Sequence, residues 1–236
     1  MRVKALIFDV FGTVVDWRSS VIREGEALGN LKGWKIDWAA FADEWRFDGY
    51  MGGIRKVISG EFPWRTADVL HRMQLDHMLE ARGLSSQLTE EEKDHFNKVW
   101  HRLMPWPDSI PGLTRLRAKF LIAPFSNGNF ALMTNMAKLI GLPWDCILSA
   151  ELTRIYKPDT RTYPLICELL GIPPDQVMMV AAHFDDLDAA RSVGLRTGFV
   201  YRPMEFGEAR KADQDTGRGY DVSALSFIEL AEMMGA

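Results

Sequence analysis

The side chains with the clearest chemical potential follow apolar runs of the chain. Asp9 comes directly after residues 3–8, which are apolar except for Lys4, and Gly12 and Thr13 stand just beyond it. Such a run is typical of a buried strand. In open α/β sheets, ligands bind in the crevice beyond the carboxyl ends of the strands. An ionised carboxylate in that crevice can attack an electrophilic carbon or phosphorus atom and form a covalent intermediate.

Three later segments carry polar side chains where apolar runs or turns end. They are Ser126-Asn127-Gly128, Lys157-Pro158-Asp159, and His183 with Asp185 and Asp186. An ammonium within a few ångströms lowers the pKa of a carboxyl group by roughly 1–3 units, so Lys157 would keep Asp9 ionised and oriented. Thr13 and Ser126 are small donors that could bind an oxygen of a substrate carboxylate or phosphate, or serve as local caps.

Strand-like runs alternate with helical patterns over most of the chain. Further apolar runs of strand length occupy residues 120–125, 146–149, 177–182 and 197–201. Apolar residues recur with a spacing near 3.6 at residues 113–119, 131–140, 162–170 and 187–193. Gly141, Gly171 and Gly194 stand where the last three of these helices are expected to end. This alternation predicts an α/β fold with a Rossmann-like, doubly wound parallel sheet.

Residues 17–104 interrupt the alternation. They hold six of the eight tryptophans, little that is typical of a strand, and long amphipathic patterns at 38–51, 67–82 and 89–103. We therefore predict an all-helical cap domain of residues 17–104, inserted into a core domain of residues 1–16 and 105–236. Most of the tryptophans are expected to form the interior of the cap. Thr89 and Glu92 predict a capping box at the start of its last helix.

Composition restricts the class of protein. The chain has 236 residues, of which 47% are hydrophobic and 25% charged, as in ordinary soluble globular proteins. Its net charge of −4 argues against a nucleic-acid partner. The first apolar stretch is too short for a signal sequence or a membrane helix, so we expect no membrane partner and a cytoplasmic location. Cys146 and Cys167 lie in no CxxC pattern and are expected to be buried packing residues.

Together these motifs resemble those of the haloacid dehalogenase superfamily. The resemblance covers essentially the whole chain and rests on Asp9-Val10-Phe11-Gly12-Thr13, Phe125-Ser126-Asn127-Gly128, Tyr156-Lys157-Pro158-Asp159 and the helical insert after the first strand. It implies that Asp9 is a nucleophile with Lys157 as its partner.

Two absences distinguish this chain from the phosphatases of that superfamily. Phosphatases usually carry a second aspartate two residues after the nucleophile, which protonates the leaving alkoxide, and an acid in the fourth motif that serves Mg²⁺. This chain has Phe11 and Ala182 at these positions. A halide leaves carbon without a proton, so dehalogenation needs neither group. Because Asp185 could replace the missing ligand, a phosphatase stays an alternative, as does a phosphonate hydrolase that uses a cap lysine.

The chain further resembles the type II, L-specific 2-haloacid dehalogenases, through the motifs above, Trp45-Arg46, and Arg161-x-Tyr163. This resemblance implies metal-independent hydrolysis of chloroacetate or L-2-chloropropanoate to a 2-hydroxy acid, with no cofactor. Asp9 would attack C2, and the halide would leave toward Arg46 and Asn127, with Arg55 as the reserve candidate. Phe11 would help to shape the pocket. Whether fluoroacetate is a substrate depends on the width of the halide site, which the sequence leaves open.

The second half of that reaction, hydrolysis of the Asp9 ester by water, leaves several roles open. Asp186 would orient Lys157 or the water. His183 stands where relatives often have asparagine, and either acts as the general base or only forms a hydrogen bond with Asp186 or Lys157. Tyr163 either lies near the site, as in the family, or packs in the core.

A receiver-like signalling domain also combines a strand-end aspartate, a threonine or serine and a lysine. Receivers are much shorter and lack a helical insert, so this class fits poorly. Related enzymes often pair, and we therefore expect a homodimer that binds a haloalkanoate and releases a halide ion.

Overall fold

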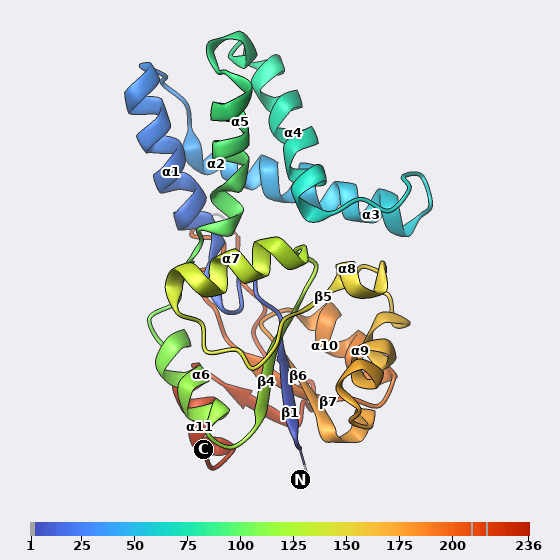
Figure 1. The fold of residues 1–236 in the computed structure, drawn as a ribbon. Helices are drawn as coiled ribbons and strands as arrows, with labels where there is room; N and C mark the ends of the chain where they lie inside the picture. Colours follow the sequence, from blue (N-terminus) through green and yellow to red (C-terminus); the bar gives the residue numbers. More distant parts are fainter. Residues whose placement is uncertain (1–2, 209, 216) are drawn as a thin grey trace. The chain divides into compact units, whose positions relative to one another are not determined.

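The computed structural model describes residues 3–208, 210–215 and 217–236. The chain forms two compact units, which are each described by themselves (Figure 1). The sheet unit joins the chain up to Asp16 with Met104–Ala236, and the helical unit is Trp17–Leu103.

Six parallel strands form the main sheet of the sheet unit, in the order β5-β4-β1-β6-β7-β8. The strands are β1 Ala5–Phe8, β4 Leu121–Ser126, β5 Leu148–Ser149, β6 Val177–Ala181, β7 Arg196–Val200 and β8 Val222–Ala224. The sheet confirms the predicted α/β class and its doubly wound, parallel arrangement. Strand β8 was not expected, because three residues are too few to show a period.

Helices cover both faces of this sheet (Figure 1). They are α6 Ser109–Arg117, α7 Phe130–Ile140, α8 Ala150–Thr153, α9 Thr162–Leu170, α10 Phe184–Ser192 and α11 Phe227–Met233. Consecutive residues of β1 point to opposite faces. Ile7 lies in a buried cluster with Ile166 of α9 and Leu187 of α10. Phe8 contacts Phe227 of α11 on the other face, with ring centroids 5.5 Å apart.

A short antiparallel ladder stands where the chain leaves and re-enters the sheet unit. It pairs β2, Val15–Asp16, with β3, Met104–Pro105. Just beyond it, Trp106 Nε1 donates to the carbonyl of Gly12 at 2.8 Å, and Ser109 Oγ donates to that of Val14 at 2.7 Å. These bonds fix the backbone that follows Asp9.

The helical unit consists of helices, turns and short irregular connections over residues 17–103. Its elements are α1 Trp17–Lys32, α2 Trp38–Glu44, the π-helix η1 Trp45–Met51, α3 Gly52–Ile58, α4 Ala67–Ala81, the 3₁₀ turn η2 Ser85–Gln87, α5 Glu90–Asn97 and the 3₁₀ turn η3 Lys98–His101. The capping box of Thr89 and Glu92 is confirmed.

Two helix predictions in this unit need correction. The expected helix over 38–51 changes to π-helical geometry at Trp45 and runs on into α3. Here the backbone of Gly49 lies against α4, because a Cβ atom on it would stand 2.2 Å from Cγ of Gln74. The expected helix over 89–103 keeps α-helical geometry only to Asn97.

Aromatic side chains fill the interior of the helical unit, as expected. Trp17, Trp45 and Trp100 are fully buried, and the ring centroids of Trp45 and Trp100 lie 5.5 Å apart. Trp34 and Trp64 are only half-buried. The prediction that most of these tryptophans form the interior of the helical unit is therefore confirmed.

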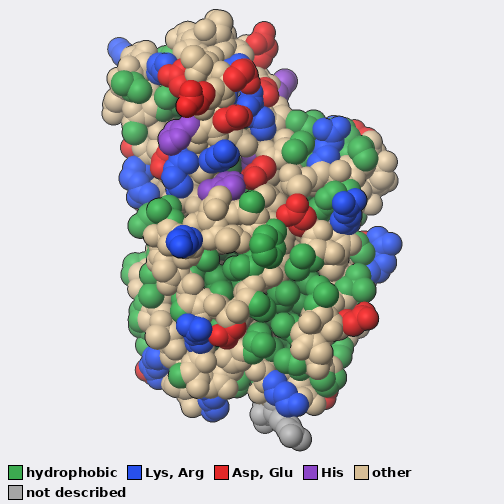
Figure 2. All heavy atoms as spheres, viewed as in Figure 1, with side chains coloured by type: hydrophobic (Ala, Val, Ile, Leu, Met, Phe, Trp, Pro, Cys, Tyr) green, Lys and Arg blue, Asp and Glu red, His purple; other side chains and the backbone are tan. Residues whose placement is uncertain are grey.

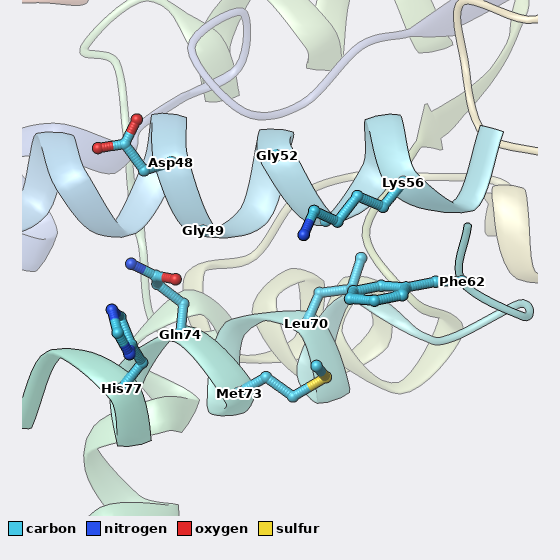
Figure 3. Close-up of a pocket in the computed structure, with 10 residues that line it drawn as sticks. Asp48, Gly49, Gly52, Lys56, Phe62, Leu70, Met73, Gln74 and His77 are labelled. Carbon is cyan, nitrogen blue, oxygen red and sulfur yellow. The ribbon is translucent and has the colours of Figure 1, made fainter. Parts of the chain in front are cut away.

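A cavity of about 230 Å³ lies within the helical unit, between α4 and the helical stretch of η1 and α3. Figure 3 shows Gly49 and Gly52 along one side of it and Met73, Gln74 and His77 along the other. Its lining includes none of the residues predicted for the catalytic site.

The surface of the sheet unit carries exposed apolar side chains. Phe130 and Leu139 of α7, Leu152 of α8 and Leu169 of α9 are among the exposed large hydrophobic residues. Figure 2 shows hydrophobic side chains gathered on one face of this unit. Cys146 is exposed as well, just ahead of β5, so the expectation that it is buried is wrong, whereas Cys167 is buried. In the described parts of the chain, no helix is both long and apolar enough to span a bilayer.

Candidate active site

Asp9 stands one residue beyond the end of β1, at the carboxyl end of the sheet. Its N–H donates to the carbonyl of Val180 at 2.9 Å, which continues the pairing with β6 by one residue. Oδ2 of Asp9 accepts a hydrogen bond from Thr13 Oγ1 at 2.7 Å, and Oδ1 lies 3.2 Å from Lys157 Nζ. Burial alone would raise the pKa of Asp9, but Lys157 and His183 outweigh it and hold this pKa well below its usual range. The site therefore contains a buried, ionised carboxylate.

Lys157 joins Asp9 to a second buried carboxylate. Its Nζ lies 2.5 Å from Asp186 Oδ2, and the other oxygen of Asp186 accepts a hydrogen bond from the Tyr163 hydroxyl at 2.6 Å. Burial would lower the pKa of Lys157, yet the two carboxylates raise it above its usual value. Burial, with Asp186 beside it, raises the pKa of Tyr163, so its phenol stays a donor. Of the two roles left open for Asp186, this geometry corresponds to orienting Lys157.

Thr13 and Ser126 use their hydroxyl groups inside the protein. Thr13 Oγ1 donates to Asp9 and accepts from the N–H of Ala182 at 3.0 Å. Ser126 Oγ accepts from the N–H of Gly128 at 3.0 Å. In this structure Thr13 thus orients the Asp9 carboxylate, and Ser126 shapes the turn after β4.

Asn127 fixes the segment that carries Lys157. Its Nδ2 donates to the backbone carbonyl of Lys157 at 2.9 Å, and its Oδ1 accepts the backbone N–H of the same residue at 2.8 Å. One N–H of the Asn127 amide is not used in this pair of bonds, since an amide nitrogen has two.

His183 bridges two carboxylates. Its Nδ1 lies 3.0 Å from Asp9 Oδ2, and its Nε2 lies 3.0 Å from both oxygens of Glu205. Burial alone would lower the pKa of His183, but Glu205 and Asp9 raise it well above the ordinary value. Among the described residues, the hydrogen bond expected between this ring and Asp186 or Lys157 is not found; the ring contacts Asp9 and Glu205 instead.

Sequence reasoning missed Glu205. The residue lies after β7 in a turn in which its N–H donates to the carbonyl of Arg202 at 3.1 Å. Arg202 Nε in turn donates to the carbonyl of Thr13 at 2.8 Å, and its Nη1 pairs with Asp108 at 2.7 Å. No period or motif marks such a turn, so only the three-dimensional contact reveals the side chain.

Phe11 and Ala182, the two positions that lack the phosphatase acids, are both buried in the sheet unit. Asp185, named above as a substitute ligand, is exposed, and its Oδ1 accepts the N–H of Asp186. Within residues 3–208, 210–215 and 217–236, no three histidine, cysteine, aspartate or glutamate side chains are grouped to hold a metal ion.

Trp45 and Arg46 belong to the helical unit, where they start the π-helix η1. Trp45 is fully buried, and its Nε1 donates to the carbonyl of His71 at 2.8 Å, as in a packing residue. The Arg46 guanidinium is also buried, 5.1 Å from the ring centroid of Tyr50. The reserve candidate Arg55 is exposed.

Comparison with known proteins agrees with this chemistry. The (S)-2-haloacid dehalogenase 4A of Burkholderia cepacia is 27% identical over 206 residues, which cover 84% of this chain and 83% of that protein. A solved L-2-haloacid dehalogenase is 40% identical and superimposes with a TM-score of 0.91 over 98% of this chain and 99% of its own. A defluorinating L-2-haloacid dehalogenase is also 40% identical, with a TM-score of 0.95 over 99% of this chain and 96% of its own.

A family model described as haloacid dehalogenase-like hydrolase matches residues 3–194, which include Asp9, Lys157 and Asp186. The chain therefore belongs to the haloacid dehalogenase-like hydrolases.

Proposed function

We propose that this protein hydrolyses short 2-haloalkanoic acids, such as chloroacetate and L-2-chloropropanoate, to 2-hydroxy acids. The observation that carries the proposal is the ionised Asp9 carboxylate beside Lys157, with Phe11 in place of a leaving-group acid. The dehalogenase names of the similar proteins support it. No metal or cofactor takes part in the proposed reaction.

In the first half-reaction, the Asp9 carboxylate attacks C2 and the halide leaves with the bonding electrons. The result is an alkyl ester of Asp9 and a free halide ion. Thr13 and His183 occupy Oδ2, whereas Oδ1 meets Lys157 at the longer distance of 3.2 Å. Oδ1 is therefore the oxygen that we assign to the attack.

In the second half-reaction, water attacks Cγ of the ester and releases the 2-hydroxy acid. His183 is the base that we assign to this step, because its Nδ1 lies 3.0 Å from Asp9 Oδ2 and thus next to the reacting carbon. Lys157 and Thr13 stabilise the carboxylate that is regenerated.

For the halide we propose Arg46 and the remaining N–H of Asn127. Aromatic rings flank the buried guanidinium of Arg46, with the centroids of Trp17 and Tyr50 at 5.5 and 5.1 Å. Such a cation is poorly hydrated and suits an anion that leaves in a water-poor pocket. The exposed Arg55 lacks these surroundings.

Halide release tests the proposal. The wild type should release chloride from chloroacetate and from L-2-chloropropanoate, unchanged by a chelator, and Asp9→Asn should show no multiple turnover. Fluoroacetate, tested in parallel, shows whether the halide site also accepts fluoride, as the defluorinating similar protein suggests. Phosphate release that depends on Mg²⁺, without halide release, would instead identify a phosphatase or a phosphonate hydrolase.

We further propose a homodimer, supported by the exposed apolar side chains on α7, α8 and α9. Light scattering should give twice the mass of the 26.8 kDa chain. A monomer at micromolar concentration would contradict this. The cytoplasmic location expected from the sequence stays a prediction.

A further inference from the structure

The contact between His183 and Glu205 is not explained by any motif of the chain. Glu205 is almost completely buried, with a side chain only 2% exposed, and both of its oxygens lie 3.0 Å from Nε2 of His183. A buried carboxylate is costly unless it is paired and hydrogen-bonded. The contact with the His183 imidazole offsets this cost.

The loop of the nucleophile is shaped around this glutamate. Gly12 has φ of +90°, and a Cβ atom on it would stand 2.0 Å from Oε1 of Glu205. Arg202, whose carbonyl accepts the N–H of Glu205, donates from its Nε to the backbone carbonyl of Thr13. The turn after β7 and the loop after β1 thus fix each other, and both carboxylates that contact His183 are set in place by them.

We propose that Glu205 is a positioning residue for hydrolysis of the Asp9 ester: it binds Nε2–H of His183 and so leaves Nδ1 as the atom that takes a proton from water. This inference rests on the proposed function, because it needs the ester. It names a residue outside the segment of the chain that the family model matches.

The carboxylates of Asp9 and Glu205 explain how His183 can be a cation beside ionised Asp9 and a base once Asp9 is an ester. In the resting enzyme Asp9 and Glu205 raise the pKa of His183, which favours the imidazolium, the form with a proton on each nitrogen. Alkylation turns Asp9 into a neutral ester, so one of the two negative charges is lost and the pKa of His183 falls. Nδ1 then gives its proton to solvent, while Nε2–H stays bound to Glu205.

The second half-reaction returns Asp9 and His183 to their starting protonation states. The oxygen of water bonds to Cγ of Asp9, and one of its protons passes to Nδ1. The bond between Cγ and the alkyl-bearing oxygen breaks, and that oxygen takes the second proton of the water as the 2-hydroxy acid forms. Asp9 is again a carboxylate and His183 again an imidazolium.

The other charged side chains near the His183 ring contact other groups. Lys157 contacts the other oxygen of Asp9, and Asp213 accepts the backbone N–H of Phe184 at 2.9 Å. Asp185, on the same helix as Phe184, is exposed. The contacts of His183 with charged side chains in the described residues are those with Asp9 and Glu205.

The test replaces Glu205 by glutamine, whose amide oxygen can still accept Nε2–H but carries no charge to stabilise the imidazolium that forms when Nδ1 takes a proton from water. Glu205→Gln should still release about one chloride per enzyme in a rapid burst, then turn over at least about tenfold more slowly, as part of the roughly 10²–10⁴-fold that a positioned base contributes. Mass spectrometry of the intact protein should show the Asp9 ester accumulating. The acid limb of the pH profile of kcat should move to lower pH, because an anion that favours the imidazolium is gone.

Glu208→Gln, on an exposed glutamate of the same segment, is the matched control and should behave as the wild type. If Glu205→Gln turns over at the wild-type rate without an adduct, the inference is wrong while the proposed function stands. If the wild type releases no halide, the proposed function itself fails.

A second measurement does not depend on the variant folding. Nitrogen-15 NMR of the wild type with labelled histidine should show both nitrogens of His183 protonated at neutral pH. An unprotonated Nε2 in the resting enzyme would overturn the proposed role of Glu205.

Discussion

Replacing Lys157 by methionine removes the ammonium that lies between two buried carboxylates. Nζ is 3.2 Å from Asp9 and 2.5 Å from Asp186. Coulomb's law at an effective dielectric constant of about 20 gives about 5–7 kcal/mol for each contact. The variant also avoids the cost of burying the ammonium, several kcal/mol, so the net loss in the free energy of unfolding should be about 3–5 kcal/mol at neutral pH.

This loss should depend on pH in a defined direction. In the wild type the pKa of Asp9 lies below its ordinary value of 3.8, so the carboxylate contributes stability above that pH and loses it only as the pH falls through the folded-state pKa. In the variant Asp9 keeps only His183 to offset its burial, and Asp186, whose pKa burial already raises, loses the ammonium that lowers it. Ionisation of these carboxyl groups as the pH rises then costs more in the folded state, and the gap in the free energy of unfolding between variant and wild type widens.

Urea unfolding followed by circular dichroism at about pH 5 and about pH 8 measures both effects. Lys138→Met, at an exposed position of α7, is the control and should change the free energy of unfolding by less than about 0.5 kcal/mol. A loss for Lys157→Met that matches this control, or that shrinks as the pH rises, would refute the assignment of Lys157 as the paired ammonium.

Three further substitutions separate the roles of neighbouring groups. Tyr163→Phe removes the hydrogen bond to Asp186 and should cost about 1.5–3 kcal/mol in the free energy of unfolding, measured with urea. Halide release should also be slower, because Asp186 then holds Lys157 less firmly. An unchanged stability would contradict the hydrogen bond. Gly12→Ala should displace Glu205 and reproduce the ester accumulation of Glu205→Gln in intact-mass measurements, and rapid turnover without adduct would disprove the coupling. Trp45→Phe removes the hydrogen bond to the His71 carbonyl and part of a fully buried ring, and should cost about 1–3 kcal/mol in urea unfolding while KM for chloroacetate stays unchanged. A raised KM would instead assign Trp45 to the substrate.

The sequence predicts the residues around Asp9 well because each follows a buried strand or a short turn. Strand ends are visible as the points where apolar runs stop, and parallel pairing then brings Asp9, Ser126 and Asp186 to one edge of the sheet. Their individual bonds are less predictable. Thr13 and Ser126 have the chemistry of substrate donors, but their hydroxyl groups meet backbone N–H groups that must also be paired inside the protein.

The helices predicted poorly are those whose hydrophobic pattern does not distinguish them from an ordinary helix or is too short to recognise. The π-helix η1 shares its apolar pattern with an ordinary helix, so the sequence shows no break at Trp45. Helix α11 is short, but Ser226 caps the N–H of Glu229, a spacing that resembles the capping box found at Thr89. That signal was present in the sequence and could have located the last helix.

Glu205 differs from these cases, because its importance depends entirely on a partner 22 residues away in the chain. If it acts only through His183, the effects of changing the two residues cannot be independent. His183→Asn alone should lower kcat by a factor within the roughly 10²–10⁴-fold expected for a lost base, and adding Glu205→Gln to it should lower kcat no further. Steady-state chloride release from the two single variants and the double variant measures this. Multiplicative losses would show that Glu205 serves the reaction by another route, such as the support of Gly12.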